Sequence, residues 1–410
     1  MACCFATTFS REQPRKRAKL QTEHDMSKQL PLQDIGHYVT VRQKRAAGFF
    51  SEESLLYVRQ ESVDLWNTLN SSNDNNVNLV VDGPPGSGKS TEVWAWALWK
   101  AQRDKLQITW YHITKCRMVK VLIDGTTTNK IITGYTARID NIEHSEGSIL
   151  IVDGVTSSIH FDVSVACQNW CVQLLGRRFI SVSSVSVNVP VQETFEANIV
   201  VFTVGSWTLA QYQAACENDQ FFNQVVDNLR CPGHEGVDDK DQLLLAKYYF
   251  AGGCARWMFE FSFNTFRMDF DQHLEQVWNY NYVLRGGGNE TVVAVNHLRS
   301  LTMVQEGDIL TKKYFFISQY VVEELAKKCH NKRKFLIESY KVAAATKNPA
   351  FEGWIFKLDM DYQLGQAWAK KENFHTKMCT VPRPLISRPD CDNCVLLIDN
   401  NDQSVDTYVE

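Results

Sequence analysis

A glycine-rich pattern that directly follows a mostly apolar strand constrains the fold of this chain more than any other feature. Residues 77–81 read Val-Asn-Leu-Val-Val, and residues 83–90 read Gly-Pro-Pro-Gly-Ser-Gly-Lys-Ser. A segment with helical character, 91–101, comes next. Strand, Gly-x-x-x-x-Gly-Lys-Ser and helix in this order are typical of a phosphate-binding P-loop. The pattern predicts nucleotide binding, against the alternative of a glycine-rich turn that binds nothing.

Each residue type in the pattern has a physical reason. Glycines let the backbone turn so that its N–H groups converge on one point, and the following helix adds its positive amino-terminal end. Lys89 is expected to contact the β- and γ-phosphates, and the Ser90 hydroxyl to bind Mg²⁺. The predicted nucleotide-binding residues are Gly83, Gly86, Ser87, Gly88, Lys89, Ser90 and Thr91.

Segments with strand and helix character alternate through the first half of the chain. Strands are predicted at 77–81, 107–113, 118–123, 148–152, 179–187 and 199–204, and helices at 51–69, 91–101 and 164–176. This alternation predicts an α/β three-layer sandwich with a mostly parallel sheet. From residue 208 the chain is expected to be mainly helical, with helices at 208–228, 241–250 and 254–283, a hinge at 285–289 and a strand at 314–317.

These segments divide the chain into five predicted regions. They are a disordered basic arm (1–36), a leading helical segment (37–76), the nucleotide-binding core (77–262), a helical region (263–348) and an irregular segment (349–410). No apolar run reaches the roughly 18–20 residues of a membrane span, so no membrane partner is expected. The amino-terminal residues do not form a signal peptide, and no export route is visible.

Charge is distributed unevenly along the chain. The net charge of -4 argues against bulk electrostatic binding to nucleic acid. The first 20 residues nevertheless carry five basic side chains and one acid, which leaves about -8 for the other 390. The cluster Pro14-Arg-Lys-Arg-Ala-Lys-Leu20 is typical of a nuclear import signal. A solvated basic tail is the alternative, and contact of this arm with DNA stays open.

A second apolar strand ends in the acid that a P-loop site requires. Ser148-Ile-Leu-Ile-Val-Asp153 predicts that Asp153 helps to hold Mg²⁺, against the alternative of an ordinary strand-end aspartate. Gly154 follows, where many ATPases place a catalytic glutamate. The base that would activate water is therefore not identified from the sequence.

Other polar residues are candidates for contact with the phosphates. The strand at 199–204 leads to Thr203 and Ser206, either of which is a candidate sensor of the γ-phosphate. Arg256 follows a glycine pair and is a candidate stabiliser of transition-state charge. Arg177 and Arg178 are weaker candidates for that role. The predicted catalytic residues are thus Lys89, Asp153, Arg256 and Ser206, with Ser90 and Asp153 as metal ligands.

A separate cluster near the carboxyl end has the residue types of a zinc site. His375, Cys379, Cys391 and Cys394 combine imidazole and thiolate ligands at compatible spacings. The alternative is a pair of reduced cysteines around a turn.

Several phrases of this sequence together resemble one family. They are Leu56-Tyr-Val-Arg59, the P-loop, Ile149-Leu-Ile-Val-Asp153, Gly205-Ser-Trp-Thr-Leu-Ala-Gln-Tyr212, Gly252-Gly-Cys-Ala-Arg-Trp-Met-Phe259 and Asn348-Pro-Ala-Phe-Glu-Gly-Trp-Ile-Phe356. The set, over roughly residues 37–360, resembles the Crinkler effectors of oomycetes and fungi and the related retrotransposon hot spot proteins of trypanosomes. The resemblance implies a P-loop ATPase module in a secreted virulence effector that acts in a host nucleus.

The chain departs from that family in two respects. No Crinkler translocation header is recognisable, and too few residues follow position 351 for a complete domain of restriction-endonuclease type. The segment 349–410 is therefore at most partly nuclease-like, and no active nuclease is predicted.

The expected function is that of a nuclear, Mg²⁺-dependent NTPase that uses ATP and has nuclear protein partners; self-association stays open. The main alternative is a nucleotide-gated module that binds protein or DNA with negligible turnover. A small-molecule kinase is a third class, although no arginine-rich lid is visible. The guanine-reading motif Asn-Lys-x-Asp does not occur, which argues against a GTPase.

Overall fold

The computed structural model describes most of the chain between residues 35 and 369. The described ranges are 35–49, 51–74, 77–114, 117–124, 128–133, 147–156, 160–172, 176–184, 198–234, 236–277, 279–285 and 293–369. The chain divides into two compact units, Met1–Val321 and Val322–Glu410. All described residues of the predicted nucleotide site belong to the first unit.

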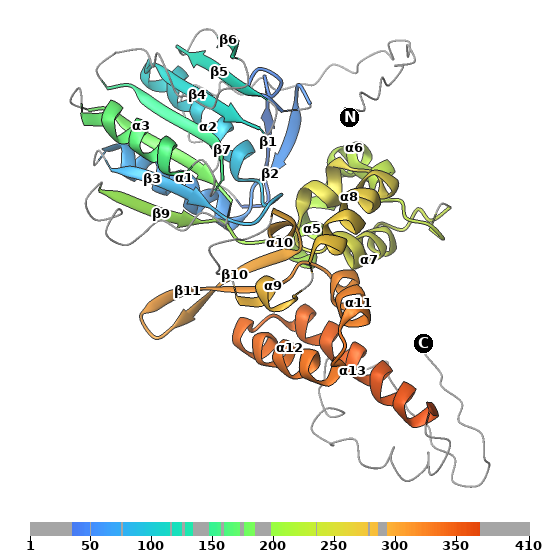
Figure 1. Ribbon diagram of the computed structural model, residues 1–410. Helices are drawn as coiled ribbons and strands as arrows, with labels where there is room; N and C mark the ends of the chain where they lie inside the picture. Colours follow the sequence, from blue (N-terminus) through green and yellow to red (C-terminus); the bar gives the residue numbers. More distant parts are fainter. Residues whose placement is uncertain are drawn as a thin grey trace, which may run out of the picture. The chain divides into compact units, whose positions relative to one another are not determined.

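A seven-stranded mixed sheet forms the core of the amino-terminal part of the first unit (Figure 1). The strands lie in the order β6 (Thr128–Thr133), β5 (Met118–Ile123), β4 (Ile108–Ile113), β7 (Ile149–Val155), β8 (Arg178–Ser183), β3 (Asn78–Asp82) and β9 (Ile199–Thr203). The pairs from β4 to β9 are parallel, and β5 is antiparallel to both of its neighbours. The prediction of an α/β fold with a mostly parallel sheet is thus confirmed.

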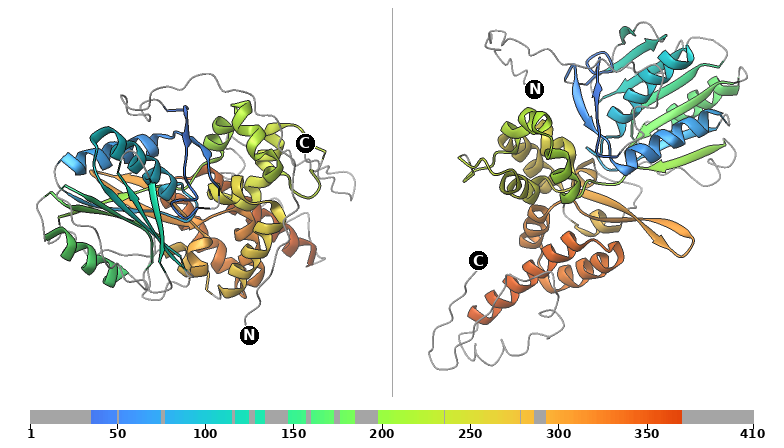
Figure 2. Two further views of the ribbon diagram at one scale, coloured as in Figure 1. Left: turned by 90° about the horizontal axis from the view of Figure 1, so that it is seen from above. Right: turned by 180° about the vertical axis from the view of Figure 1, so that it is seen from behind.

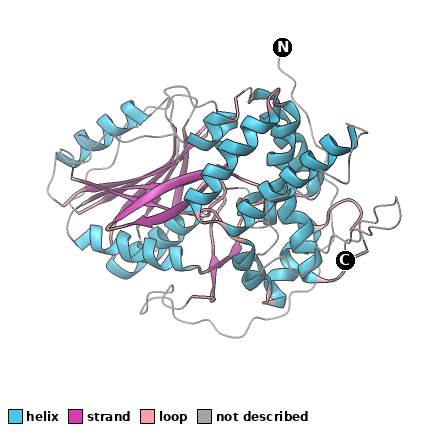
Figure 3. Cartoon of the chain, turned by 90° about the horizontal axis from the view of Figure 1, so that it is seen from below, coloured by secondary structure: helices cyan, strands magenta, loops and turns pink. Residues whose placement is uncertain are grey.

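Helices cover both faces of this sheet. Figure 2 shows α1 (Gln60–Asp74) and α2 (Lys89–Asp104) over one face and α3 (His160–Val172) over the other. Figure 3 shows the strands between these helices. The side chains of β7 alternate accordingly: Ile149 and Ile151 belong to the core beneath α1 and α2, and Leu150 and Val152 to the core beneath α3. Burial on both faces is why these strands are continuously apolar.

A small hairpin precedes α1, and it corrects one prediction. β1 (Tyr38–Val41) pairs antiparallel with β2 (Ser54–Tyr57). The helix predicted over 51–69 is wrong in its first half, because residues 54–57 gain more from pairing with β1 and burying Leu56 than from local helix formation. The helix itself begins only at Gln60.

The remainder of the first unit is mainly helical, as predicted, but it also contains a hairpin. The helices are α5 (Leu209–Cys216), α6 (Asp219–Leu229), α7 (Lys240–Ala251), the π-helix η1 (Arg256–Glu260), α8 (Phe263–Gln276), α9 (Asn281–Arg285) and α10 (Val293–His297). β10 (Arg299–Glu306) and β11 (Ile309–Phe316) pair antiparallel, whereas only a strand at 314–317 was predicted. Residues 286–289 of the predicted hinge lie outside the described residues.

The second unit contains two long helices, α12 (Lys332–Thr346) and α13 (Pro349–Ala369). The Tyr340 hydroxyl donates a hydrogen bond to the Asp359 carboxylate at 3.2 Å and ties the two helices together. Helix α11 (Gln319–Lys328) begins at the end of the first unit. In the described part of the chain, no helix combines the length and the apolar character needed to cross a membrane.

Truncation of a β7 side chain tests the two-faced core. Ile151 is fully buried beneath α2, so Ile151→Ala is expected to lower the free energy of unfolding by about 2–5 kcal/mol through lost burial and a residual cavity. The matched control Ile309→Ala, at a side chain that is 67% exposed, should change it by less than about 0.5 kcal/mol. Urea denaturation measures both, and equal effects would contradict the assignment of the core.

Candidate functional site

The loop of residues 83–88, the glycine loop, connects the end of β3 to the start of α2. Gly83 and Gly86 have φ angles of 151° and 73°. A Cβ on Gly83 would lie 2.4 Å from the carbonyl oxygen of Val204, and one on Gly86 would lie 2.2 Å from the Cys254 sulfur. Both positions therefore require glycine for conformation and for space. Gly88 is the N-cap of α2 and has no side chain to cap the first N–H groups of the helix.

Lys89 is buried with its ammonium inside the glycine loop. Its Nζ donates to the carbonyl oxygens of Gly83 at 2.7 Å and Pro84 at 2.8 Å, and lies 3.3 Å from Ser87 Oγ. Burial lowers the pKa of Lys89 to about 8, although the nearby Asp82 carboxylate opposes this shift. The loop thus holds a cation in a desolvated position beside its own backbone.

Ser90 and Asp153, predicted from two distant motifs, are in direct contact. The Ser90 hydroxyl donates to Asp153 Oδ1 at 2.8 Å. Ser90 lies in the first turn of α2, and Asp153 lies on β7 with only 2% of its surface exposed. A hydroxyl beside a buried carboxylate is an oxygen pair of the kind that binds Mg²⁺. Thr91, the remaining predicted residue, is half-buried next to Ser90.

His112 is a member of this cluster that sequence reasoning missed. Its Nδ1 lies 2.7 Å from Asp153 Oδ2, and its side chain is 16% exposed. A carboxylate accepts hydrogen bonds, so Nδ1 is the nitrogen that carries the proton. His112 comes from β4, which pairs with β7 directly opposite Asp153. In the sequence, His112 is only a histidine near the end of a predicted strand. Its proximity to Asp153 can be inferred only when β4 is known to lie beside β7.

Three chain segments fix the outer side of the glycine loop through its carbonyl groups. The Ser87 carbonyl accepts from the fully buried Arg59 guanidinium at 2.9 Å and from the Trp207 indole at 3.3 Å. The Arg59 guanidinium also stacks on Trp207, 4.5 Å from the ring centre. The Gly86 carbonyl accepts from the Ala255 N–H at 3.0 Å. The sequence assigned no role to Arg59 or Trp207.

Arg256 lies beside the glycine loop, in the segment that begins at Ala255. Its Cβ would be 3.2 Å from a Cβ on Gly86, and its charge contributes to the lowered pKa of Lys89. Its side chain is 47% exposed and forms an ion pair with Glu260 at 3.8 Å. A half-exposed arginine next to the loop has the freedom to reach an anion bound there.

The two candidate sensor residues are held by other groups. The Thr203 hydroxyl donates to Asp82 at 2.6 Å, and the other oxygen of Asp82 forms an ion pair with Lys312. The Ser206 hydroxyl accepts from the Leu301 N–H of β10 at 3.1 Å. The structure therefore places Thr203 against Asp82 at the strand end before the loop, and Ser206 against Leu301 of β10.

The remaining candidates lie elsewhere. Arg177 and Arg178 are at the amino end of β8, whereas the glycine loop follows the carboxyl end of the parallel strand β3. Arg177 donates to the Trp170 carbonyl at 3.1 Å, and Arg178 faces Trp96. They do not join the cluster. The predicted zinc ligands His375, Cys379, Cys391 and Cys394 and residues 1–34 of the basic arm lie outside the described residues.

Compared with known proteins, the chain matches no protein-family model and no curated protein. The chemistry of the site consequently has to be inferred from its geometry. The site lies at the carboxyl ends of β3 and β7, where it combines a buried ammonium, the uncapped start of a long helix and a Ser–Asp oxygen pair. The helix that follows β3, α2, packs on one face of the sheet, and the helix that follows β7, α3, packs on the opposite face. Ligands of open α/β sheets bind at such positions.

The lowered pKa of Lys89 makes stability depend on pH. Between pH 8 and 10.5 the unfolded chain keeps a proton on this lysine that the folded protein has lost, so stability rises with pH. The free energy of unfolding of the wild type should increase relative to Lys89→Met by about 1 kcal/mol per pH unit between pH 8 and 10. Parallel urea titrations of the two proteins measure this difference. A constant difference would mean that Lys89 is not desolvated.

Proposed function

We propose that this chain is a Mg²⁺-dependent P-loop NTPase that uses ATP. The observation that carries the proposal is the 2.8 Å hydrogen bond from Ser90 to Asp153 beside the buried ammonium of Lys89. Ser90 and Asp153 are 63 positions apart in the sequence, and each was predicted to hold the same metal ion. Burial of a carboxylate costs free energy, and a glycine-rich turn that binds nothing would not require one next to its serine.

The residues of the site fit a nucleotide triphosphate and its metal ion. Mg²⁺ would be held by Ser90 and Asp153, and when bound it supplies charge neutralisation at the phosphates. The amides of residues 86–91 supply hydrogen-bond donors for phosphate oxygens, and the positive end of α2 favours their charge. The Lys89 ammonium is already desolvated, so its attraction to an anion is strong. Arg256 is the residue we propose to stabilise charge that develops at the outer phosphate.

The contacts of the glycine loop also support the proposed relation to Crinkler-type effectors. Arg59, Trp207 and Ala255 come from three of the phrases that carry the resemblance, and all three donate to carbonyls of the loop. These contacts connect three phrases of the resemblance to the predicted nucleotide site. By that resemblance, we propose that the chain acts as a secreted effector in a host nucleus, with nuclear protein partners.

One observation favours a second candidate, a nucleotide-gated binding module with negligible turnover. Gly154 follows Asp153, with its φ angle at 87°, and a Cβ there would lie 2.1 Å from the Ile113 carbonyl oxygen. The backbone therefore excludes a glutamate at this position. Nucleotide binding would then stabilise one conformation of the helical region without rapid hydrolysis.

Phosphate release from ATP and from GTP in the presence of Mg²⁺ tests the proposed activity. Wild type should release phosphate from ATP, and Lys89→Ala and Asp153→Ala should each lower the rate by about 10²–10³-fold, because each removes charge stabilisation. The matched controls Lys327→Ala and Asp238→Ala change exposed side chains of the same types and should keep the wild-type rate.

The result without turnover distinguishes the two candidates. If ATP raises the melting temperature of wild type but not of Lys89→Ala, and no phosphate is released, the protein is the nucleotide-gated module. If ATP changes neither quantity, both candidates are wrong.

His112 is expected to act by orienting Asp153. His112→Ala should raise the Mg²⁺ concentration that gives half-maximal phosphate release by about 10–100-fold, because the carboxylate loses its second hydrogen bond. His112→Asn offers an amide donor in place of Nδ1–H and should restore most of the affinity. A Mg²⁺ titration of both variants measures this, with His234→Ala as the control. Equal loss in the alanine and asparagine variants would contradict an orienting role.

A further inference from the structure

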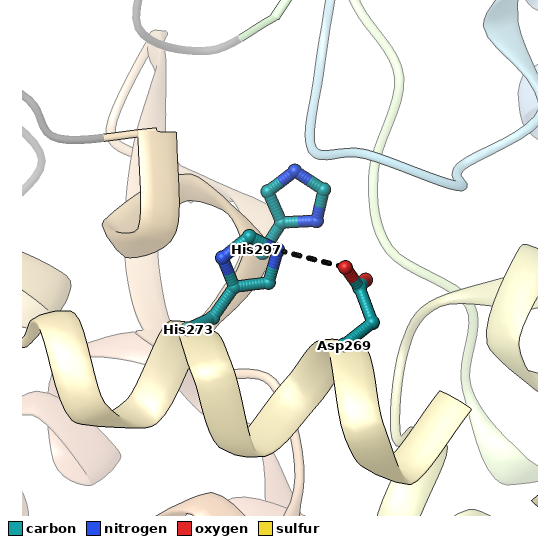
Figure 4. A group of neighbouring side chains, drawn as sticks. All are labelled: Asp269, His273 and His297. Carbon is teal, nitrogen blue, oxygen red and sulfur yellow. Dashed lines mark ion pairs between the residues drawn. The ribbon is translucent and has the colours of Figure 1, made fainter. Parts of the chain in front are cut away.

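Two histidines and an aspartate gather outside the glycine loop, in the helical part of the first unit. Asp269 and His273 are one turn apart on α8, and His297 is the last residue of α10 (Figure 4). One ligand atom from each of the three side chains lies within 4.8 Å of the others. The group is distinct from Ser90 and Asp153, which offer only oxygen ligands.

The packing around the group brings the two imidazole rings face to face. The rings of His273 and His297 stack with their centres 4.2 Å apart and their planes 20° apart. The buried Trp257 also stacks on His297, with centres 6.1 Å apart. Nε2 of His273 lies 3.6 Å from Oδ1 of Asp269. These contacts bring the three side chains together without a bound ion.

The three side chains differ in how far they are exposed to solvent, and this difference gives an ion access to the group. The side chain of His273 is 13% exposed, and the nearby residues Phe270 and Leu274 of α8 are buried. The Asp269 carboxylate, in contrast, is 50% exposed. An ion can therefore reach the group from solvent past Asp269, while the apolar neighbours strengthen its attraction to the carboxylate.

We propose that Asp269, His273 and His297 bind a divalent transition-metal ion of the Zn²⁺ class. Imidazole nitrogen is a preferred ligand of zinc, copper, iron and nickel, whereas Mg²⁺ prefers oxygen. Two histidines and one carboxylate are the ligands of a three-coordinate protein site, which leaves one position for water or an exogenous group. Tetrahedral zinc places its ligand atoms about 3.4 Å apart and lies in the plane of each imidazole that binds it. Binding therefore requires at least one of the two stacked rings to rotate out of the stack. The half-exposed Asp269 can supply a further movement on the order of 1 Å.

The experiment uses the full chain with Cys379→Ser, Cys391→Ser and Cys394→Ser, which removes the three cysteine ligands predicted near the carboxyl end. After treatment with a chelator and its removal, the protein is titrated with Zn²⁺ in a calorimeter and with Co²⁺ in a spectrophotometer. We expect one equivalent of each ion to bind. The Co²⁺ complex should show visible ligand-field bands without a thiolate charge-transfer band, because no sulfur is among the proposed ligands.

Substitution of the three ligands assigns the bound ion to this group. His273→Gln, His297→Gln and Asp269→Asn, each in the same background, should raise the dissociation constant for Zn²⁺ at least tenfold. His330→Gln, at an exposed histidine of the second unit, is the matched control and should leave it unchanged. Excess Mg²⁺ should not displace Zn²⁺.

Two results would overturn the proposal. One is the absence of stoichiometric uptake, and the other is an unchanged dissociation constant in Asp269→Asn and His273→Gln. Far-ultraviolet circular dichroism establishes that each variant is folded. If His297→Gln loses its packing on Trp257 and unfolds, Asp269→Asn decides the question, because it alters only a half-exposed side chain.

Discussion

The first unit depends on one constraint, which is that the carbonyl groups of the glycine loop need hydrogen-bond donors. A buried backbone carbonyl without a partner costs about as much as a lost hydrogen bond. The loop obtains its donors from Lys89 within, from Arg59 before it in the sequence, and from Trp207 and Ala255 far after it. The carbonyl groups of the glycine loop therefore connect the sheet to the segment that follows the β1–β2 hairpin and to the helical region.

The same contacts explain how the loop can present the start of α2 to a ligand. With its carbonyls satisfied on the outer side, the loop retains its shape, and the start of α2 is left without a side-chain cap at Gly88. Glu92, one turn further along α2, is buried beside Arg59 and Ser62, and burial raises its pKa. The loop is thus supported by the buried side chains of Arg59, Ser62 and Glu92. Loss of any of them would alter the conformation of the loop at the phosphate-binding side that we propose.

How much of this could be predicted from the sequence depends on whether the signal is local. The strand, glycine loop and helix from Asn78 to Asp104 form one continuous pattern, and the pairing of Ser90 with Asp153 followed from two such patterns. His112 could not be assigned, because it reaches Asp153 only when β4 lies beside β7. The pairing of β1 with β2 was missed because the spacing of apolar residues over 51–69 also fits a helix, and the strand partner lies more than ten positions away in the sequence.

The sequence by itself determined that the chain has an α/β fold, where its glycine loop lies, and which hydroxyl and carboxylate form the oxygen pair. These follow from backbone conformation and from the period of burial, both of which act over a few residues. The tertiary structure alone decided that Arg59 and Trp207 support the loop, that Ser206 is bound to β10, and that His273 stacks on His297. Such contacts join distant segments, and their partners are chosen by the order and packing of the elements.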